Sequence, residues 1–189
     1  ISVSSSDTGE ATVSPATLTF TPANYDTTQQ VTVTGVNDND IDGHEEYQIS
    51  LSAEVDPEVT TVAGSGTGTF ANGTGPAASF KKPIGITTDG TNLYVADSSN
   101  HKIRKIVIST GVVTTLAGST SSGSTDATGT AARFNSPGHI TNVGNNLYVA
   151  DRNNHKIRKI VISTGVVTTL AGSGSSGSTD GTGTSARFN

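Results

Sequence analysis

Carboxylate side chains are concentrated in one short segment of the chain, residues 37–46. The segment contains five acidic residues, Asp38, Asp40, Asp42, Glu45 and Glu46. Ca²⁺ takes about six to eight oxygen ligands in flexible geometry, and carboxylates are among the ligands it prefers. The segment is therefore the best candidate for metal binding, with His44 expected to face solvent. The alternative is an exposed hairpin loop, because Asp and Asn suit turns and stay solvated there.

His139 is the second residue whose side chain could do chemistry. It stands where an otherwise repeated segment has Gly85. An imidazole ring can bind a metal or transfer protons near neutral pH. No partner for His139 is visible in the sequence, so a packed or hydrated side chain is the alternative interpretation.

The elements that would position these side chains follow from an internal repeat. Residues 97–118 read DSSNHKIRKIVISTGVVTTLAG, and residues 151–172 repeat them 54 positions later with changes only at positions 98 and 99. A fixed period of this length indicates one supersecondary unit that is copied and stacked. Runs rich in β-branched residues, broken by Gly, Asn and Asp, predict four strands per unit. In the first unit these strands are expected at about residues 83–88, 92–96, 102–108 and 112–117.

Four strands per unit favour a propeller blade, since solenoid repeats are usually shorter or helical. The run that begins ARFNSPGHI at Ala132 and continues through NLYVADRNNHKIRKI resembles NHL-repeat proteins. Asn100-His101 and Asn154-His155 stand at the N-H of that motif, while its third letter, Leu, is displaced. The resemblance implies an all-β propeller part over residues 57–189, with about two full blades plus fragments. It also places His139 on the innermost strand, whose side chains line the central channel in which metal-dependent propeller enzymes hold their ligands.

Residues 1–56 show a second pattern, the period-2 alternation of half-buried sandwich strands, with strands expected at residues 18–20, 30–36 and 47–51. The run SPATLTFTPANYDTTQQVTVTGVNDNDIDGHEEYQISL resembles the later strands of Calx-β-like sandwich domains of bacterial surface proteins, so residues 1–56 are expected to be the C-terminal part of such a domain. In that family an acidic cluster at this loop binds Ca²⁺ in some members. By that pattern the resemblance implies a Ca²⁺ site whose closest matches are Asp38, Asp40 and Glu45, with Asp42 also fitting.

The polar residues that recur in both units are expected to do a job common to every blade. They are Asp97, Asn100, His101, Arg104 and Lys105. Asp and Asn suit turn hydrogen bonds, and Lys and Arg suit solvation of the outer strands. Asp126 and Asp180, which correspond to Asn72, are expected to be turn residues. The alternative is RNA binding by the KIRK runs, which fits poorly with an acidic chain that has no Trp.

Composition excludes several classes of site. The formal net charge is −5 and the pI is about 5.2, so no net basic field would gather nucleic acid. No apolar stretch approaches the roughly 20 residues that a membrane-spanning helix needs. The chain has no Cys, which excludes disulfides, thiolate metal sites and cysteine nucleophiles. It has no Met either, so a mature product or a fragment is expected.

Together the two parts predict a non-enzymatic extracellular or cell-surface protein that serves structure or adhesion, with a surface-fibre subunit as a variant. Ca²⁺ is the only cofactor implied. Two blades cannot close a ring, so the expected partners are other copies of the chain or further blades of a longer one. A protein or glycan ligand is another candidate partner, although glycan binding would need aromatic residues on the loops. The alternative function is a metal-dependent propeller lyase or hydrolase with His139 in its channel.

Overall fold

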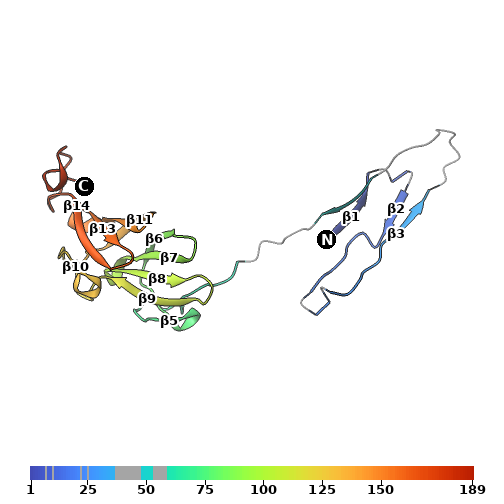
Figure 1. Cartoon of the computed structure of the whole chain (residues 1–189), viewed down its shortest axis with the longest axis horizontal. Coiled ribbons are helices and arrows are strands. Elements are labelled where there is room, and N and C mark those ends of the chain that lie inside the picture. Colours follow the sequence, from blue (N-terminus) through green and yellow to red (C-terminus); the bar gives the residue numbers. More distant parts are fainter. Residues whose placement is uncertain (7, 10, 22, 25, 37–47, 53–58) are drawn as a thin grey trace. The chain divides into compact units, whose positions relative to one another are not determined.

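The computed structural model of the chain describes residues 1–6, 8–9, 11–21, 23–24, 26–36, 48–52 and 59–189. They form two compact units, Ile1–Val59 and Thr60–Asn189. Both units are built from antiparallel β-strands joined by turns (Figure 1). The helices among the described residues are 3-10 turns of three residues each, and none is long and apolar enough to cross a bilayer. The predicted all-β fold class is confirmed.

The N-terminal unit contains two antiparallel strand pairs. β1 (Ser2–Ser5) pairs with β4 (Ile49–Ser52), and β2 (Ala11–Ser14) pairs with β3 (Thr32–Gly35). The prediction of a strand at residues 18–20 is wrong. Leu18 is instead a buried residue in an otherwise exposed loop, and its backbone exchanges hydrogen bonds of 2.8 and 2.9 Å with the backbone of Ile1. These pairs alone do not identify a Calx-β domain, which stays a prediction.

The C-terminal unit contains two five-stranded sheets with the same strand order. In the first sheet, blade 1, four consecutive strands are antiparallel neighbours: β6 (Pro83–Thr88), β7 (Asn92–Asp97), β8 (Lys102–Val107) and β9 (Val112–Ala117). A short strand that precedes them in sequence, β5 (Gly73–Thr74), pairs with β9 on its outer side. The four long strands lie within a residue of those predicted from the sequence.

The second sheet, blade 2, repeats this arrangement 54 residues later. Its strands are β10 (Ala127–Thr128), β11 (Pro137–Val143), β12 (Asn146–Asp151), β13 (Lys156–Val161) and β14 (Val166–Ala171). The short first strand again pairs with the last strand of its sheet. Each blade therefore closes its outer edge with a segment that comes before its innermost strand in sequence.

The 3-10 turns among the described residues fall into two sets whose members are 54 residues apart. One set is η1 (Gly75–Ala77), η3 (Gly129–Ala131) and η5 (Gly183–Ser185), and the other is η2 (Ser98–Asn100) and η4 (Arg152–Asn154). The motif residues His101 and His155 end η2 and η4 with left-handed φ values of 55° and 51°. This conformation is uncommon for a residue other than glycine and marks a constrained position in both blades.

The hydrophobic core of the C-terminal unit lies between the two blades. We call the side of a blade that carries Tyr94 and Ile103, or their equivalents in blade 2, its forward face. We call the side that carries Leu147 and Val149, or their equivalents in blade 1, its rear face. The forward face of blade 1 packs against the rear face of blade 2. All four of these residues are 0% exposed. Removal of this apolar surface from water is the main term that holds the blades together.

Hydrogen bonds that involve side chains also cross from blade to blade. The backbone N–H of Ser136 donates to His101 Nδ1 at 3.1 Å, and the backbone N–H of Asn142 donates to Thr87 Oγ1 at 3.2 Å. Each bond joins an atom of blade 1 to the innermost strand of blade 2 or the loop before it. They fix the register in which one blade stacks on the next.

Candidate functional site

Each blade holds a buried arginine, on β8 in blade 1 and on β13 in blade 2. Arg104 in blade 1 and Arg158 in blade 2 have no exposed side-chain surface. The prediction that the repeated arginines solvate the outer strands is therefore wrong. The reason is that acceptors from the loop before each blade surround the guanidinium group and cover it.

The guanidinium group of Arg104 donates hydrogen bonds to four acceptors. Nη1 donates to Asp97 Oδ2 at 2.8 Å and to Ser79 O at 3.0 Å. Nη2 donates to Ala71 O at 2.7 Å and to Asn72 Oδ1 at 2.9 Å. A buried charge is costly unless it is paired and hydrogen-bonded, and these bonds satisfy Nη1 and Nη2, whereas Nε is buried without a partner among the described residues. The cluster ties the end of β7 to the loop before β6.

Asp97 completes the same cluster from the end of β7. Its Oδ1 accepts a hydrogen bond from the backbone N–H of Lys81 at 2.7 Å, and its Oδ2 accepts one from Asn100 Nδ2 at 2.9 Å. The turn hydrogen bonds expected at Asp97 and Asn100 are therefore present. They hold the η2 turn, at whose end His101 lies.

Blade 2 repeats the cluster with one chemical change. Arg158 pairs with Asp151 Oδ2 at 2.8 Å and with Asp126 Oδ1 at 2.5 Å, where blade 1 has the neutral Asn72. Burial alone would raise the pKa of Asp126, but hydrogen bonds from Thr169 and Arg158 outweigh it and lower that pKa. At Asp151 burial dominates and raises the pKa. Asp126, expected to be a turn residue, is the partner of a buried arginine.

His139 lies on β11 with an exposed side chain. Its backbone packs against β6: a Cβ atom placed on Gly85 would lie 2.9 Å from His139 Cα. In the part of the chain that the structure describes, no three His, Cys, Asp or Glu side chains form a group able to hold a metal. The structure therefore places His139 on the innermost strand and, among the described residues, in no such group, and its catalytic role stays a prediction.

The acidic segment of the N-terminal unit lies outside the described residues. Asp38, Asp40, Asp42 and Glu45 all fall within residues 37–47. Ca²⁺ binding by this segment stays a prediction.

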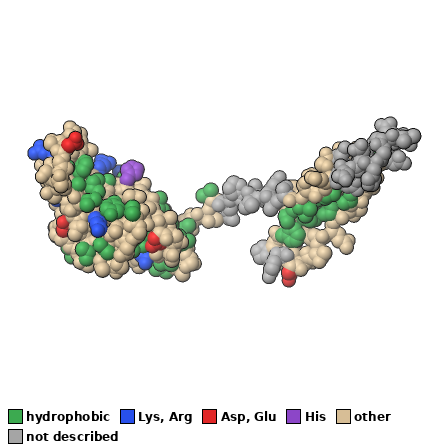
Figure 2. Space-filling view, turned by 45° about the horizontal axis from the view of Figure 1, so that its top comes forward, with side chains coloured by type: hydrophobic (Ala, Val, Ile, Leu, Met, Phe, Trp, Pro, Cys, Tyr) green, Lys and Arg blue, Asp and Glu red, His purple; other side chains and the backbone are tan. Residues whose placement is uncertain are grey.

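The rear face of blade 1 carries exposed apolar side chains. Ile84 and Ile86 are 50% and 60% exposed, whereas Ile140, which corresponds to Ile86, is 8% exposed between the blades. A hollow of about 370 Å³ lies on this face, with Phe80 and Val95 in its wall. Figure 2 shows hydrophobic side chains gathered in patches on the surface of the C-terminal unit. An apolar patch of this kind indicates an interaction surface.

The forward face of blade 2 is open as well. Tyr148 and Ile157 are half-buried, whereas their equivalents Tyr94 and Ile103 are 0% exposed. The stack of two blades thus ends in an open rear face on blade 1 and an open forward face on blade 2. These are the same two kinds of face that pack against each other between the blades.

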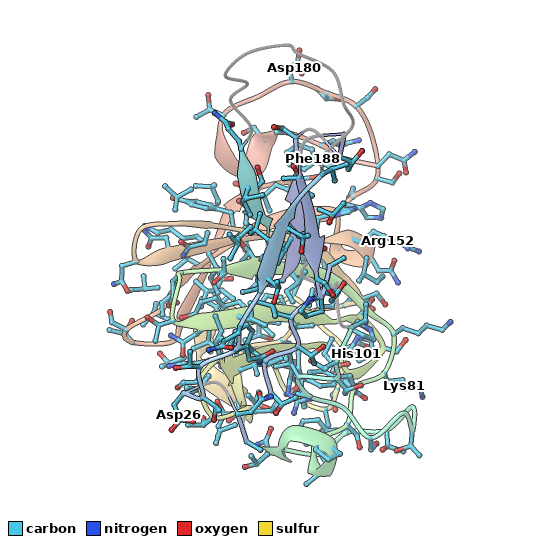
Figure 3. All side chains as sticks on the ribbon, turned by 90° about the vertical axis from the view of Figure 1, so that its right-hand side faces the viewer. Asp26, Lys81, His101, Arg152, Asp180 and Phe188 are labelled. Carbon is cyan, nitrogen blue, oxygen red and sulfur yellow. The ribbon has the colours of Figure 1, made fainter. Side chains whose placement is uncertain are left out.

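The two motif histidines differ in the hydrogen bonding of their Nδ1 atoms. His101 Nδ1 accepts its hydrogen bond from Ser136, but His155 Nδ1 is buried without a partner among the described residues. Lys82 is the equivalent of Ser136, with φ of 52° against 53°, and its backbone N–H has no acceptor in the described part of the chain. Figure 3 shows His101 and Arg152 along the same edge of the unit. Sequence reasoning missed the buried, unpaired Nδ1 atom of His155, although the repeated N-H was the signal that pointed to it.

No protein-family model matches the chain. The chain is 41% identical over 105 residues to NHL repeat-containing protein 2 of Homo sapiens, a match that covers 52% of this chain and 14% of that protein. It is 32% identical over 148 residues to Protein SUPPRESSOR OF QUENCHING 1, chloroplastic, of Arabidopsis thaliana, covering 72% of this chain and 14% of that one. This chain therefore spans about one seventh of the length of these relatives.

Solved structures from Bacteroides thetaiotaomicron also resemble the chain. A structural genomics protein of unknown function is 30% identical with a TM-score of 0.48, covering 56% of this chain and 26% of the other. An auxiliary nutrient binding protein is 26% identical with a TM-score of 0.46, covering 57% and 28%. Over about half of its length, then, this chain is similar in sequence to NHL repeat-containing proteins, in keeping with the N-H motif of its two blades.

Proposed function

We propose that the chain is a non-enzymatic interaction module of an extracellular or cell-surface protein that serves structure or adhesion. Its working surfaces are the rear face of blade 1 and the forward face of blade 2, each of which binds a further blade. Similarity to NHL repeat-containing proteins and a polar, β-rich composition support this proposal.

The observation that carries the proposal is the match between the two open faces. The buried Nδ1 atom of His155 lacks the donor that His101 has, and Lys82 N–H lacks the acceptor that Ser136 N–H has. A buried polar atom without a partner costs free energy comparable to a lost hydrogen bond. Docking of one blade 2 onto another blade 1 would satisfy both groups and cover Ile86.

In a solution of this chain the available blades are those of other copies, so the test is self-association. Sedimentation velocity over a series of concentrations is expected to show species heavier than the 19.1 kDa chain. Ile86→Asp should reduce this association, because a charge on the rear face would be desolvated without a partner. Loss of the His155 acceptor in His155→Phe should reduce it as well.

Val143→Asp is the matched control. Val143 is 61% exposed, and blade 1 carries Asp89 at the equivalent position beside the packed interface. This variant is expected to associate as the native chain does. A native chain that stays at 19.1 kDa at every concentration would overturn the proposal, as would equal association of the Ile86→Asp variant.

A further inference from the structure

A groove of about 460 Å³ beside β8 and β9 holds a group of side chains that neither open blade face uses. Its wall includes Phe70, Asn72, Lys102, Thr114, Thr120 and Thr130. The three threonines are exposed, so their hydroxyl groups are accessible at the rim. A concave site with a few polar groups and an apolar wall is the general form of a small-molecule site.

Lys102 is the charged group of this groove. The residue is 3% exposed, and its Nζ atom lies 4.7 Å from the centre of the Phe70 ring. In the described part of the chain no oxygen atom accepts a hydrogen bond from this Nζ atom. Burial, together with the nearby charge of Arg104, lowers the pKa of Lys102. The groove therefore holds a buried ammonium group that lacks a bonded anion.

Comparison with blade 2 shows why blade 1 alone has this surplus charge. In blade 2, Arg158 is paired with two carboxylates, those of Asp151 and Asp126. In blade 1, Arg104 is paired with Asp97 only, because Asn72 replaces the second carboxylate. When the arginine, the neighbouring lysine and the carboxylates of each cluster are counted, blade 1 therefore carries one more positive charge than blade 2.

The aromatic wall is also confined to blade 1. Phe70 corresponds to Ser124 in the second repeat, and its side chain is 42% exposed. Both the extra positive charge and the apolar surface therefore belong to one blade. A role common to every blade does not account for them, whereas a ligand bound at one place does.

We propose that this groove binds an acidic sugar, a uronic acid or a residue of an anionic polysaccharide. The carboxylate of the sugar pairs with the ammonium group of Lys102 and balances the extra positive charge of blade 1. The threonine hydroxyls donate hydrogen bonds to the sugar hydroxyls and accept hydrogen bonds from them. The exposed part of Phe70 packs on the apolar side of the sugar ring. This site is separate from His155 and Ile86, so it does not depend on association of the blades.

Isothermal titration of the 189-residue chain with D-glucuronate tests this site. Saturable binding is expected for the native chain. Binding should weaken by about tenfold or more in Lys102→Met, which keeps the length of the side chain but removes its charge. It should weaken similarly in Asn72→Asp, which copies the internal carboxylate of blade 2 and is expected to keep the unfolding temperature of the native chain.

The matched control is Lys156→Met, the same change in blade 2, which should leave D-glucuronate binding unchanged. Acetate and D-glucose separate the two parts of the proposed ligand. If acetate binds as tightly as D-glucuronate, the proposal that the ligand is a sugar is wrong. If D-glucose binds as tightly, the proposed role of the ammonium group is wrong. Absence of saturable D-glucuronate binding, or unchanged binding in both Lys102→Met and Asn72→Asp, would overturn the site itself.

Discussion

Arg104 joins two segments that lie far apart in the sequence. Its guanidinium group bonds Asp97 at the end of β7 and the backbone oxygens of Ser79 and Ala71 in the preceding loop. Without the arginine, these carbonyl and carboxylate groups would remain buried with too few donors. Removal of one partner of a buried ion pair costs more than the pair itself contributes, because the other charge stays desolvated.

Arg104→Met is therefore expected to lower the free energy of unfolding by about 3–5 kcal/mol. Urea denaturation followed by far-ultraviolet circular dichroism measures this change. Arg152→Met is the control, because Arg152 is exposed on the η4 turn, as Figure 3 shows. Equal stability of the two variants would contradict a structural role for the buried cluster.

At this scale the sequence predicts some roles and misses others. The turn bonds of Asp97 and Asn100 could be predicted, because Asp and Asn next to a strand end suit turns whatever surrounds them. The burial of Arg104 could not, because it depends on the loop of residues 71–79 crossing over the strand. The same limit applies to Lys102, because its burial against the Phe70 ring is visible only in the folded chain.

Among the elements, the two innermost strands make the closest contact between the blades. β6 approaches β11 so nearly that a Cβ atom on Gly85 would lie 2.6 Å from Gly138 O and 2.9 Å from His139 Cα. Real side chains do not tolerate such distances, so position 85 requires glycine or a wider separation of the strands. Gly85 is thus the residue that lets blade 2 stack on blade 1.

Gly85→Ala should destabilise the C-terminal unit by about 1–3 kcal/mol, the usual cost of forcing an extra carbon into a packed interface. Thermal unfolding measured by calorimetry tests this. Gly138→Ala is a matched control on β11, since a Cβ atom there would meet its nearest neighbour, Ala150 O, at an ordinary 3.8 Å. If both variants unfold at the native temperature, the contact between β6 and β11 is looser than described.

The strand boundaries of the blades could be predicted from the sequence because Gly and Asn residues separate the runs of β-branched residues. Gly90 and Gly111, for example, adopt φ values of 90° and 68° at two of the predicted turns. In the N-terminal unit the period-2 alternation predicts the strands less well. It does not predict β2 (Ala11–Ser14), and it predicts a strand at residues 18–20, which form a loop. Short strands of small residues carry little periodicity, and their pairing is decided by partners far along the chain.

For the C-terminal unit as a whole, the two open faces are not identical to the pair that packs inside it. Tyr148 and Ile157 match Tyr94 and Ile103, but His139 occupies the place of Gly85. A blade that docked on blade 2 in the internal geometry would meet the Cβ atom of His139 where the internal contact has a glycine. The outer junction must therefore open at its inner edge, which weakens it relative to the internal one.

His139→Gly should remove this obstruction and tighten self-association by about tenfold, because relief of such overpacking is worth about 1–3 kcal/mol. Sedimentation equilibrium of the native and variant chains measures the change. Val143→Gly introduces glycine on the same strand at an exposed position and should not tighten association. Weaker association of His139→Gly than of Val143→Gly would mean that the imidazole contributes to the outer junction, so that blade 2 binds its neighbour through His139 and in a geometry different from the one inside the chain.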